Sequence, residues 1–149
     1  MRPVTIIVAV LVLAALAAGV FFLNSSLESA QKSGGFESKT TVTIKVDKEQ
    51  YKAGEKVKII VMNEGPSDAT FLSASLGLII RDDQNRVVFA FVGAQVLTTL
   101  KAGESREFEW DQKDGGGATV EPGTYTATVV YSDDRGFESK VASTIKIVQ

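Results

Sequence analysis

The sequence predicts an all-β fold, an antiparallel β-sandwich of about seven to nine strands preceded by one N-terminal hydrophobic helix. Two observations predict the sandwich: apolar and polar residues alternate in short stretches, and turn signals separate these stretches at intervals of about 8–12 residues. A third observation, a long uncharged apolar run, predicts the helix. We expect three parts: a hydrophobic helix at residues 1–24, a flexible tether at residues 25–35 and a β-sandwich domain at residues 36–149.

Residues 108–131 contain the two strands expected at the centre of the domain. Phe108 and Trp110 share one face of an extended segment, because alternate side chains of a strand point to opposite sides. After an acidic, glycine-rich loop and a Pro-Gly turn, Tyr125, Ala127, Val129 and Tyr131 alternate with residues that are mostly threonine. This period of two indicates an antiparallel strand with one buried face. We expect Trp110 to lie in the core between the sheets.

The earlier strands follow the same pattern. Inward-facing side chains are expected at Val42, Ile44, Val46, Val57, Ile59 and Val61. The tetrapeptide Lys-Ala-Gly-Glu occurs at residues 52–55 and again at residues 101–104, and each copy is expected to form a turn before a strand. Pro66 and Pro122 stand in expected loops, where a missing N–H group does no harm to a sheet.

Two stretches break the alternation. Residues 76–81, expected as a strand, and residues 87–92, expected to pair back onto it, are apolar on both faces. Either other parts of the domain cover the second face, or that face is exposed and binds a partner. For the second case we expect Phe89, Phe91 and Val92 to make the contact, because buried aromatic side chains dominate interface energies.

The N-terminal run from residue 4 to residue 23 is apolar apart from one threonine. At 1.5 Å per helical residue it reaches about 30 Å, the thickness of the hydrocarbon layer of a membrane. We expect an uncleaved, single-pass anchor with the domain outside the cytoplasm, since Arg2 favours a cytoplasmic N-terminus.

Two other interpretations of this run remain open. One is a cleaved signal peptide, although its apolar core is normally only about 7–15 residues long. The other is a pilin-like helix that packs inside a filament. Small residues four apart permit close helix approach, and they occur here as two pairs, Ala14 with Ala18 and Ala15 with Gly19.

The composition argues against catalysis and for binding. The chain has neither histidine nor cysteine, which removes the usual general base, the histidine-assisted nucleophiles, disulfides and thiolate metal sites. The formal net charge of −2 is too small to indicate a nucleic-acid partner. Acidic loops, such as residues 111–114, leave calcium as a minor alternative to a solvated turn. We expect no enzyme, no cofactor, no metal and no small-molecule substrate.

An internal repeat links the two ends of the domain. Gly-Phe-Glu-Ser-Lys occurs at residues 35–39 and 136–140, and Thr-Ile-Lys follows at residues 43–45 and 144–146. Both copies are explained by two similar edge strands. Alternatively, the first strand of one copy exchanges with the last strand of the next and builds a polymer. The residues of such an exchange would be Phe36, Val42, Ile44, Val46, Phe137, Ile145 and Ile147.

Several motifs together resemble the BsuPI domain, the family of a bacterial intracellular proteinase inhibitor. These are Asn63 at a strand end, the segment at residues 76–89, Trp-Asp-Gln at residues 110–112 and Pro-Gly-Thr-Tyr at residues 122–125. The resemblance covers residues 42–148 and implies an immunoglobulin-like sandwich. It also implies proteinase inhibition, although the N-terminal apolar run departs from an intracellular protein.

These observations lead to one expected function and two alternatives. We expect a membrane-anchored, extracytoplasmic immunoglobulin-like module that binds a protein partner by its loops and one apolar strand face. The first alternative is a structural subunit of a cell-surface filament, which assembles through its helix or by strand exchange. The second alternative, implied by the resemblance, is a BsuPI-like proteinase inhibitor.

Overall fold

The computed structural model describes residues 40–149, and ten strands lie in this part of the chain. They are β1 (Val42–Val46), β2 (Tyr51–Lys52), β3 (Val57–Asn63), β4 (Ala69–Phe71), β5 (Ile79–Arg81), β6 (Val87–Ala90), β7 (Thr98–Leu100), β8 (Ser105–Trp110), β9 (Gly123–Ser132) and β10 (Glu138–Val148). The all-β prediction is confirmed, and the count exceeds seven to nine because β2, β4, β5 and β7 have only two or three residues each.

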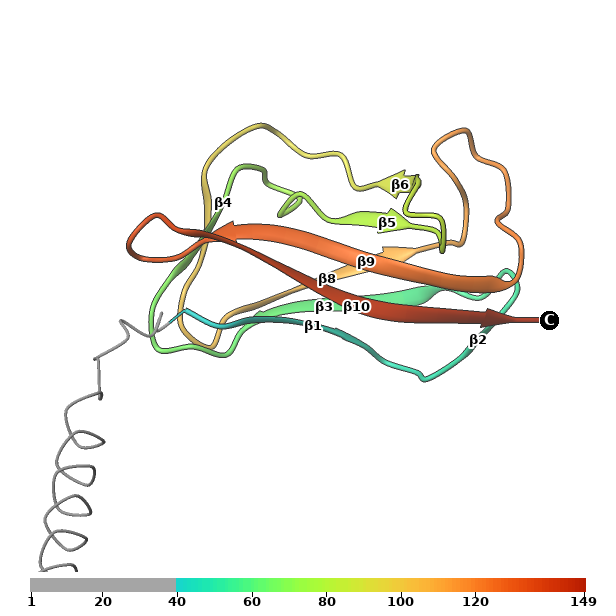
Figure 1. Ribbon diagram of the computed structural model, residues 1–149, viewed down its shortest axis with the longest axis horizontal. Coiled ribbons are helices and arrows are strands. Elements are labelled where there is room, and N and C mark those ends of the chain that lie inside the picture. Colours follow the sequence, from blue (N-terminus) through green and yellow to red (C-terminus); the bar gives the residue numbers. More distant parts are fainter. Residues whose placement is uncertain (1–39) are drawn as a thin grey trace, which may run out of the picture. The chain divides into compact units, whose positions relative to one another are not determined.

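The strands form two sheets (Figure 1). The smaller sheet has the order β1-β3-β8, and all of its pairs are antiparallel. The larger sheet has the order β2-β10-β9-β4-β7. Strand β5 pairs with β9 on the same edge as β4, and β6 pairs with the outer edge of β5. In the view of Figure 1 the long strands β9 and β10 lie in front of β3 and β8.

Phe108 and Trp110 do not belong to a strand at the centre of the fold. Their strand, β8, is an edge of the smaller sheet, whereas β9 lies inside the larger one. The loop between them therefore crosses from one sheet to the other. The expected central position is thus wrong for β8, because a sequence pattern shows which face of a strand is buried but not which strands lie beside it.

Trp110 lies in the core, as predicted, with 1% of its surface exposed. Its ring packs edge-on against Tyr125 with the ring centroids 5.5 Å apart. The Tyr125 hydroxyl donates to the Glu121 carbonyl four residues upstream, at 2.7 Å. A tyrosine at the start of a strand, bonded back to its own approach loop, is the tyrosine corner of immunoglobulin-like sandwiches. The remaining core follows the predicted alternation, with Val42, Ile44, Val57, Ile59, Val61, Ala127, Val129 and Ile145 all buried.

Residues 76–81 are not a continuous strand. Strands β4 and β5 both lie on the same edge of β9, opposite Ser132 and residues 126–128 respectively. Between them the chain leaves the sheet at residues 72–78. One strand further from β9, β7 pairs with β4 and β6 pairs with β5. The segment between β6 and β7, residues 91–97, leaves the sheet next to residues 72–78. The apolar residues that the pattern assigned to one strand are thus divided between a turn and a short strand.

A bulge in β6 explains why residues 87–92 lack alternation. Phe89 lies opposite Ile80 and Val87 opposite Arg81, so Val88 is an extra residue in the ladder. An extra residue shifts the side-chain alternation, and Val88 and Phe89 both pack against the core as a result.

Both predicted Lys-Ala-Gly-Glu turns form in the same way. Gly54 has a φ of +81° and Gly103 a φ of +77°, a region that favours glycine because it has no Cβ. In each turn the glutamate carboxylate accepts the N–H of the lysine, at 3.0 Å for Glu55 and 2.9 Å for Glu104.

The predicted N-terminal helix and tether, the pairs Ala14–Ala18 and Ala15–Gly19, and Phe36 lie outside the described residues. Between residues 40 and 149 no helix is long and apolar enough to span a membrane.

Candidate functional site

The outer face of the larger sheet carries a groove where the two segments at residues 72–78 and 91–97 leave the ladder. We call these segments the paired loops. The groove has a volume of about 280 Å³ and lies between the paired loops, β9 and the start of β10. Its wall includes Thr70, Leu72, Ser75, Ile79, Ala90, Phe91, Gln95, Val130, Ser132 and Glu138.

The paired loops hold each other through main-chain bonds. The Ala74 N–H donates to the Ala94 carbonyl at 2.9 Å, and the Phe91 N–H donates to the Leu78 carbonyl at 3.0 Å. The Ser75 hydroxyl, which is buried, donates to the Phe91 carbonyl at 2.8 Å. These bonds satisfy polar groups that a chain leaving a sheet would otherwise leave unpaired.

Two residues show how closely the paired loops fit. A Cβ atom on Gly93 would lie 2.5 Å from the main-chain nitrogen of Ser75, so no larger residue fits there without movement. Leu76 is buried although its φ is +54°, a region in which leucine is strained. From the smaller sheet, Arg106 donates to the Ala74 carbonyl at 2.5 Å. The groove is therefore built on a fixed backbone.

Large apolar side chains stand around the groove in the open. Leu72 is 66% exposed, Leu97 74% and Val130 48%. Leu72 and Leu97 each lie one residue beyond the Phe71–Thr98 pair of strands β4 and β7, so they are neighbours on the outer face. Three exposed apolar side chains beside one groove form a surface that a binding partner can cover.

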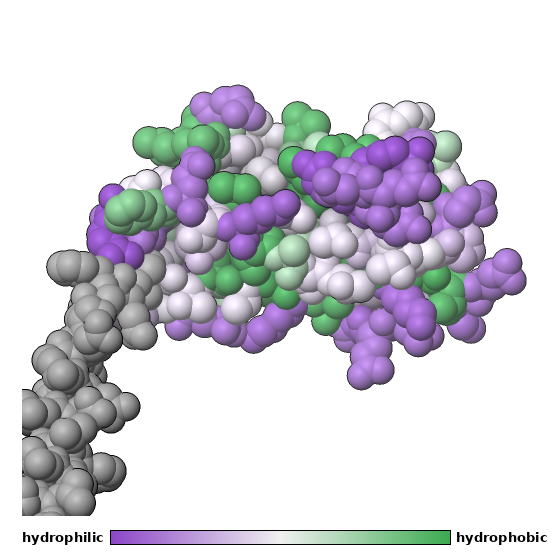
Figure 2. Space-filling model, viewed as in Figure 1, coloured by the Kyte–Doolittle hydropathy of each residue, from purple (hydrophilic) through white to green (hydrophobic). Residues whose placement is uncertain are grey.

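The outer faces of the two sheets differ in chemistry. On the smaller sheet, lysines and glutamates form ion pairs across strands, including Lys58–Glu107 at 2.8 Å and Lys56–Glu109. Such a face is well solvated. The outward residues at the centre of the larger sheet are uncharged, and each is either threonine or apolar: Ile79, Ala90, Thr126, Thr128, Val130, Ala142 and Thr144. Figure 2 shows white and green residues along the middle of this face, with a large purple patch beside them and further purple residues at the margins.

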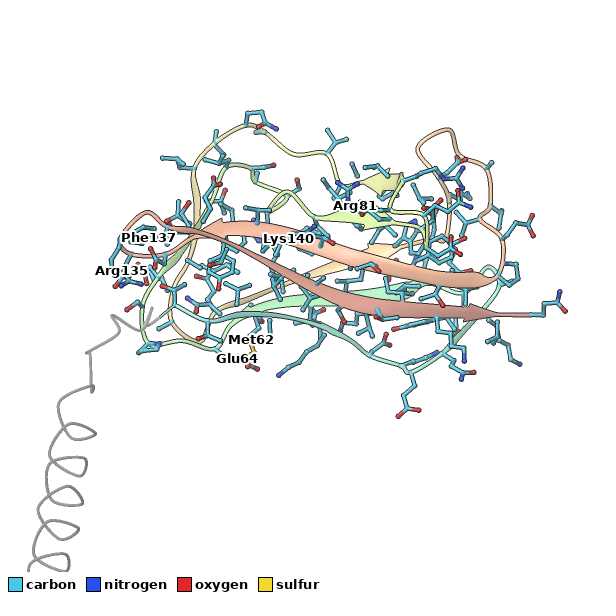
Figure 3. All side chains as sticks on the ribbon, viewed as in Figure 1. Met62, Glu64, Arg81, Arg135, Phe137 and Lys140 are labelled. Carbon is cyan, nitrogen blue, oxygen red and sulfur yellow. The ribbon has the colours of Figure 1, made fainter. Side chains whose placement is uncertain are left out.

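Two cations rise from the larger sheet beside this uncharged strip (Figure 3). Lys140 stands opposite Val130 on one side of β9, and Arg81 stands opposite Thr126 on the other. Among the described residues, neither takes part in an ion pair within 4.0 Å. Lys140 is exposed, whereas Arg81 is half-buried and donates to the Asn85 carbonyl at 2.9 Å. The face therefore offers apolar contacts and, chiefly, the Lys140 cation.

The predicted contact residues Phe89, Phe91 and Val92 take different positions. Phe91 packs edge-on between Phe89 and Phe108, with ring centroids 5.0 Å and 5.2 Å apart, and all three rings are half-buried against the core. Phe91 also lines the groove, whereas Val92 is 97% exposed on the paired loops. Phe89 lies away from the groove and lines a hollow with Lys56 and Glu109. The three rings thus belong mainly to the core of the domain, and only Phe91 among them reaches the floor of the groove.

Sequence reasoning did not select Leu72, Leu97 and Val130. The signal for Val130 is present, because it is the one large apolar residue on the threonine side of β9. Leu72 and Leu97 carry no such signal: their outward orientation depends on the pairing of β4 with β7, two strands far apart in the sequence.

The residues proposed for strand exchange are mostly in the core. Ile44, Ile145 and Ile147 are buried, as is Val42, and Val46 packs against the core. Phe137 is instead 66% exposed in the hairpin between β9 and β10, with the Arg135 guanidinium 5.3 Å from the ring centroid. Figure 3 shows both residues at that hairpin.

A second, more polar hollow of about 710 Å³ lies at the other end of the sheet and includes Asp82, Asp114 and Glu121 in its wall. Asp82 pairs with Arg86 at 2.7 Å, and Asp114 accepts the N–H groups of two loop residues at 2.9 Å. These carboxylates stabilise turns. Between residues 40 and 149 no group of three or more acidic, histidine or cysteine side chains is placed to hold a metal ion.

The most strongly shifted pKa lies outside the groove, at Tyr51. Burial, together with the hydrogen bond that its hydroxyl donates to Asp47 at 2.5 Å, raises the pKa of Tyr51 to about 12. The same bond holds the pKa of Asp47 below its ordinary value. This pair closes the loop before β2 and has a structural role.

No family model matches the sequence, and no curated protein matches it. Among solved structures, the dimeric latent PorU of Porphyromonas gingivalis is similar with a TM-score of 0.51 and 17% identity, over 73% of this chain and 9% of PorU. The CARDB domain of PF1109 from Pyrococcus furiosus, solved with di-metal ions, has a TM-score of 0.39 and 12% identity, over 75% and 90% of the two chains. The ApaA protein of Bordetella pertussis has a TM-score of 0.45 and 19% identity, over 75% and 98%.

The chain thus spans a small part of PorU, and at this identity the likeness concerns the fold alone. Together with the tyrosine corner and the two packed sheets, it identifies an immunoglobulin-like β-sandwich.

Proposed function

We propose that this chain is a membrane-anchored, extracytoplasmic module without catalytic activity, and that it binds a protein partner through the groove and its apolar rim. The observation that carries the proposal is the difference between the two outer faces. One has cross-strand ion pairs, whereas the other has an uncharged strip, a groove and exposed leucines. In soluble domains, an exposed apolar surface of this kind usually marks a site that a binding partner covers.

The free energy expected from apolar burial supports the rim of the groove, formed by Leu72, Leu97 and Val130, as the main contact. Full burial of one leucine side chain stabilises an interface by about 1.5–3 kcal/mol. Because the paired loops are already held by their own hydrogen bonds, little ordering is needed on binding. Full burial of Leu72 and Leu97 together contributes about 3–6 kcal/mol before the cost of association. A micromolar affinity, which is about 8 kcal/mol, therefore needs further contacts from the groove beside them.

Crosslinking in intact membranes, with a matched pair of variants, tests the proposal. Leu72→Ser should lose the crosslinked partner. Phe137→Ser should keep it, since Phe137 is equally exposed at 66% but lies in the hairpin and not in the wall of the groove. Both chains should keep their β spectrum by circular dichroism. If both variants keep the partner, or both lose it, the groove is not the binding surface.

The anchor has its own test. A membrane-spanning segment keeps a chain in the membrane fraction during alkaline carbonate extraction and releases it only into detergent. Recovery of the full chain in the carbonate-soluble fraction would contradict the anchor.

The filament alternative rests on the repeat. Residues 35–46 and 136–147 align without a gap, and Ile44 and Ile145, equivalent in that alignment, are both buried. Ser143 lies opposite Ala127 in the ladder of β10 with β9. The double variant Ser143→Cys with Ala127→Cys should give a disulfide within one chain if β10 remains paired with β9 of its own chain. Loss of this disulfide, with fibres in sheared surface material, would favour strand exchange instead.

A BsuPI-like inhibitor is the third candidate, and it depends on the resemblance. Two of the residues that carry the resemblance, Trp110 and Gln112, are buried parts of the framework, so they support a shared scaffold more directly than a shared activity. Inhibition of a panel of serine proteases by the full chain in detergent tests this candidate. No effect at micromolar concentration would remove it.

A further inference from the structure

In the part of the chain that the structure describes, β10 has the longest strand edge without a hydrogen-bonded strand partner, although β1 of the smaller sheet lies near it. It pairs with β9 from Glu138 to Ile147, but on its other edge only Ile147 and Val148 have a partner, in β2. Residues 138–146 therefore present main-chain N–H and C=O groups that no described strand uses. A long, regular edge of this kind is a template for another strand.

The side chains along this edge are open to a partner. On the outer face, Glu138, Lys140, Ala142, Thr144 and Lys146 are all exposed. The edge contains no proline, and its ladder with β9 runs without a bulge. Of the devices that usually block strand addition, the edge has the charged side chains Glu138, Lys140 and Lys146 and the nearby strand β1, but neither proline nor a bulge.

We propose that two copies of the chain pair antiparallel through this edge, with Ala142 opposite Ala142 of the second copy. The proposal is independent of the groove. In this register each copy places Glu138 opposite Lys146 and Lys140 opposite Thr144 of the other. The contact is its own complement under a two-fold axis, as an isologous interface requires.

Charge selects this register. A contact centred on Ser143 would place Lys140 opposite Lys146 of the second copy, and like charges directly opposite are unfavourable. A contact centred on Val141 would leave Glu138 opposite Thr144, without an ion pair. Of these three registers, only the one centred on Ala142 forms two opposite-charge pairs and keeps the lysines apart.

The edge of β8 does not offer the same fit. It is shorter, with residues 105–110, and a two-fold contact centred on Phe108 would place Glu107 opposite Glu109 of the second copy. The edge of β6 is interrupted by the bulge at Val88. Charge and regularity therefore single out β10 for self-association.

Pairing of this kind joins the two larger sheets into one, with their outer faces on the same side. The two grooves would then open in the same direction. A partner with two copies of its binding segment would gain affinity from the second contact without any new interaction.

Cysteine substitution tests the register, because the chain has no cysteine of its own. Directly opposite residues of antiparallel strands have Cα atoms about 4.5–5.5 Å apart, which suits a disulfide. In the full chain in detergent, Ala142→Cys should form a disulfide-linked dimer under mild oxidation. Thr144→Cys is the matched control on the same strand and face, since the two copies of residue 144 would be four residues out of register.

Charge exchange gives a second readout. Lys146→Glu should weaken the dimer several-fold in sedimentation equilibrium, because it opposes two carboxylates at each end of the contact. Adding Glu138→Lys to the same chain should restore the dimer, since the opposite charges are re-formed in reverse.

Selective crosslinking of Ala142→Cys and rescue by the double charge variant would support the proposal. Equal crosslinking of both cysteine variants, no crosslinking of either, or a dimer that is indifferent to Lys146→Glu would overturn it.

Discussion

Replacement of Gln112 by alanine should destabilise the fold although the residue is distant from the groove. Gln112 is fully buried, and its side-chain amide joins two turns that are far apart in the sequence. The amide oxygen accepts the Gly54 N–H at 2.8 Å, and the amide nitrogen donates to the Lys52 carbonyl at 2.8 Å. Gln112 therefore fastens the turn between β2 and β3 to the crossing between the sheets.

The magnitude follows from these two bonds. Only the Gly54 N–H loses its partner, because the Lys52 carbonyl also accepts the Glu55 N–H at 3.0 Å. An unsatisfied main-chain group costs about 1–3 kcal/mol, and the lower half of that range applies because the turn is partly open to water. The cavity left by the amide adds about 1 kcal/mol. The expected loss is therefore about 2–3 kcal/mol of the free energy of unfolding, which lowers the melting temperature by roughly 8–12 °C.

Urea unfolding of the full chain, followed by circular dichroism, measures this loss. Gln84→Ala is the control, because Gln84 is exposed in a surface turn and should change the free energy of unfolding by less than about 0.5 kcal/mol. Gln112→Glu separates bonding from packing: it keeps the size of the side chain, but its carboxylate faces the Lys52 carbonyl. A variant Gln112→Glu that is as stable as the parent would refute the hydrogen-bond argument.

Three further predictions concern the turns and the buried tyrosine. Gly93→Ala should lower the free energy of unfolding by about 1–3 kcal/mol, because the new Cβ would lie 2.5 Å from the Ser75 nitrogen; urea unfolding identical to that of the parent would contradict this fit. Gly54→Ala and Gly103→Ala should each cost about 1–2 kcal/mol in thermal unfolding, since both φ angles are near +80° and no neighbour obstructs the methyl group; a cost near zero would show that the turns relax. The free energy of unfolding should also fall as the pH rises from 10 to 12, by roughly 2–3 kcal/mol, because the unfolded chain releases the Tyr51 proton near pH 10 while the folded pKa is about 12; Tyr51→Phe should remove this dependence, and an unchanged alkaline slope would assign it to another group.

The faces of the long strands could be predicted from the sequence. Tyr125, Ala127, Val129 and Tyr131 are buried and alternate with the outward side of β9, as their period of two indicates. Both Lys-Ala-Gly-Glu turns were predictable for the same reason: a turn is a property of four consecutive residues.

The neighbours of each strand could not be predicted in this way. β8 and β9 are consecutive strands, yet they belong to different sheets. The groove exists because β4 and β5 share one edge of β9 with a loop between them, and that arrangement depends on pairs such as Thr70 with Ser132. Hydrogen-bonded partners so far apart in the chain leave no periodic signal in either segment.

The sequence by itself determined the β class, the buried faces of the long strands and the position of the turns, because each of these depends on residues close together in the chain. Only the tertiary structure decided which apolar residues remain outside. Phe91 lies in the floor, while Leu72, Leu97 and Val130 stand at the rim, because a bulge, two paired loops and long-range strand pairing decide how deep each side chain lies.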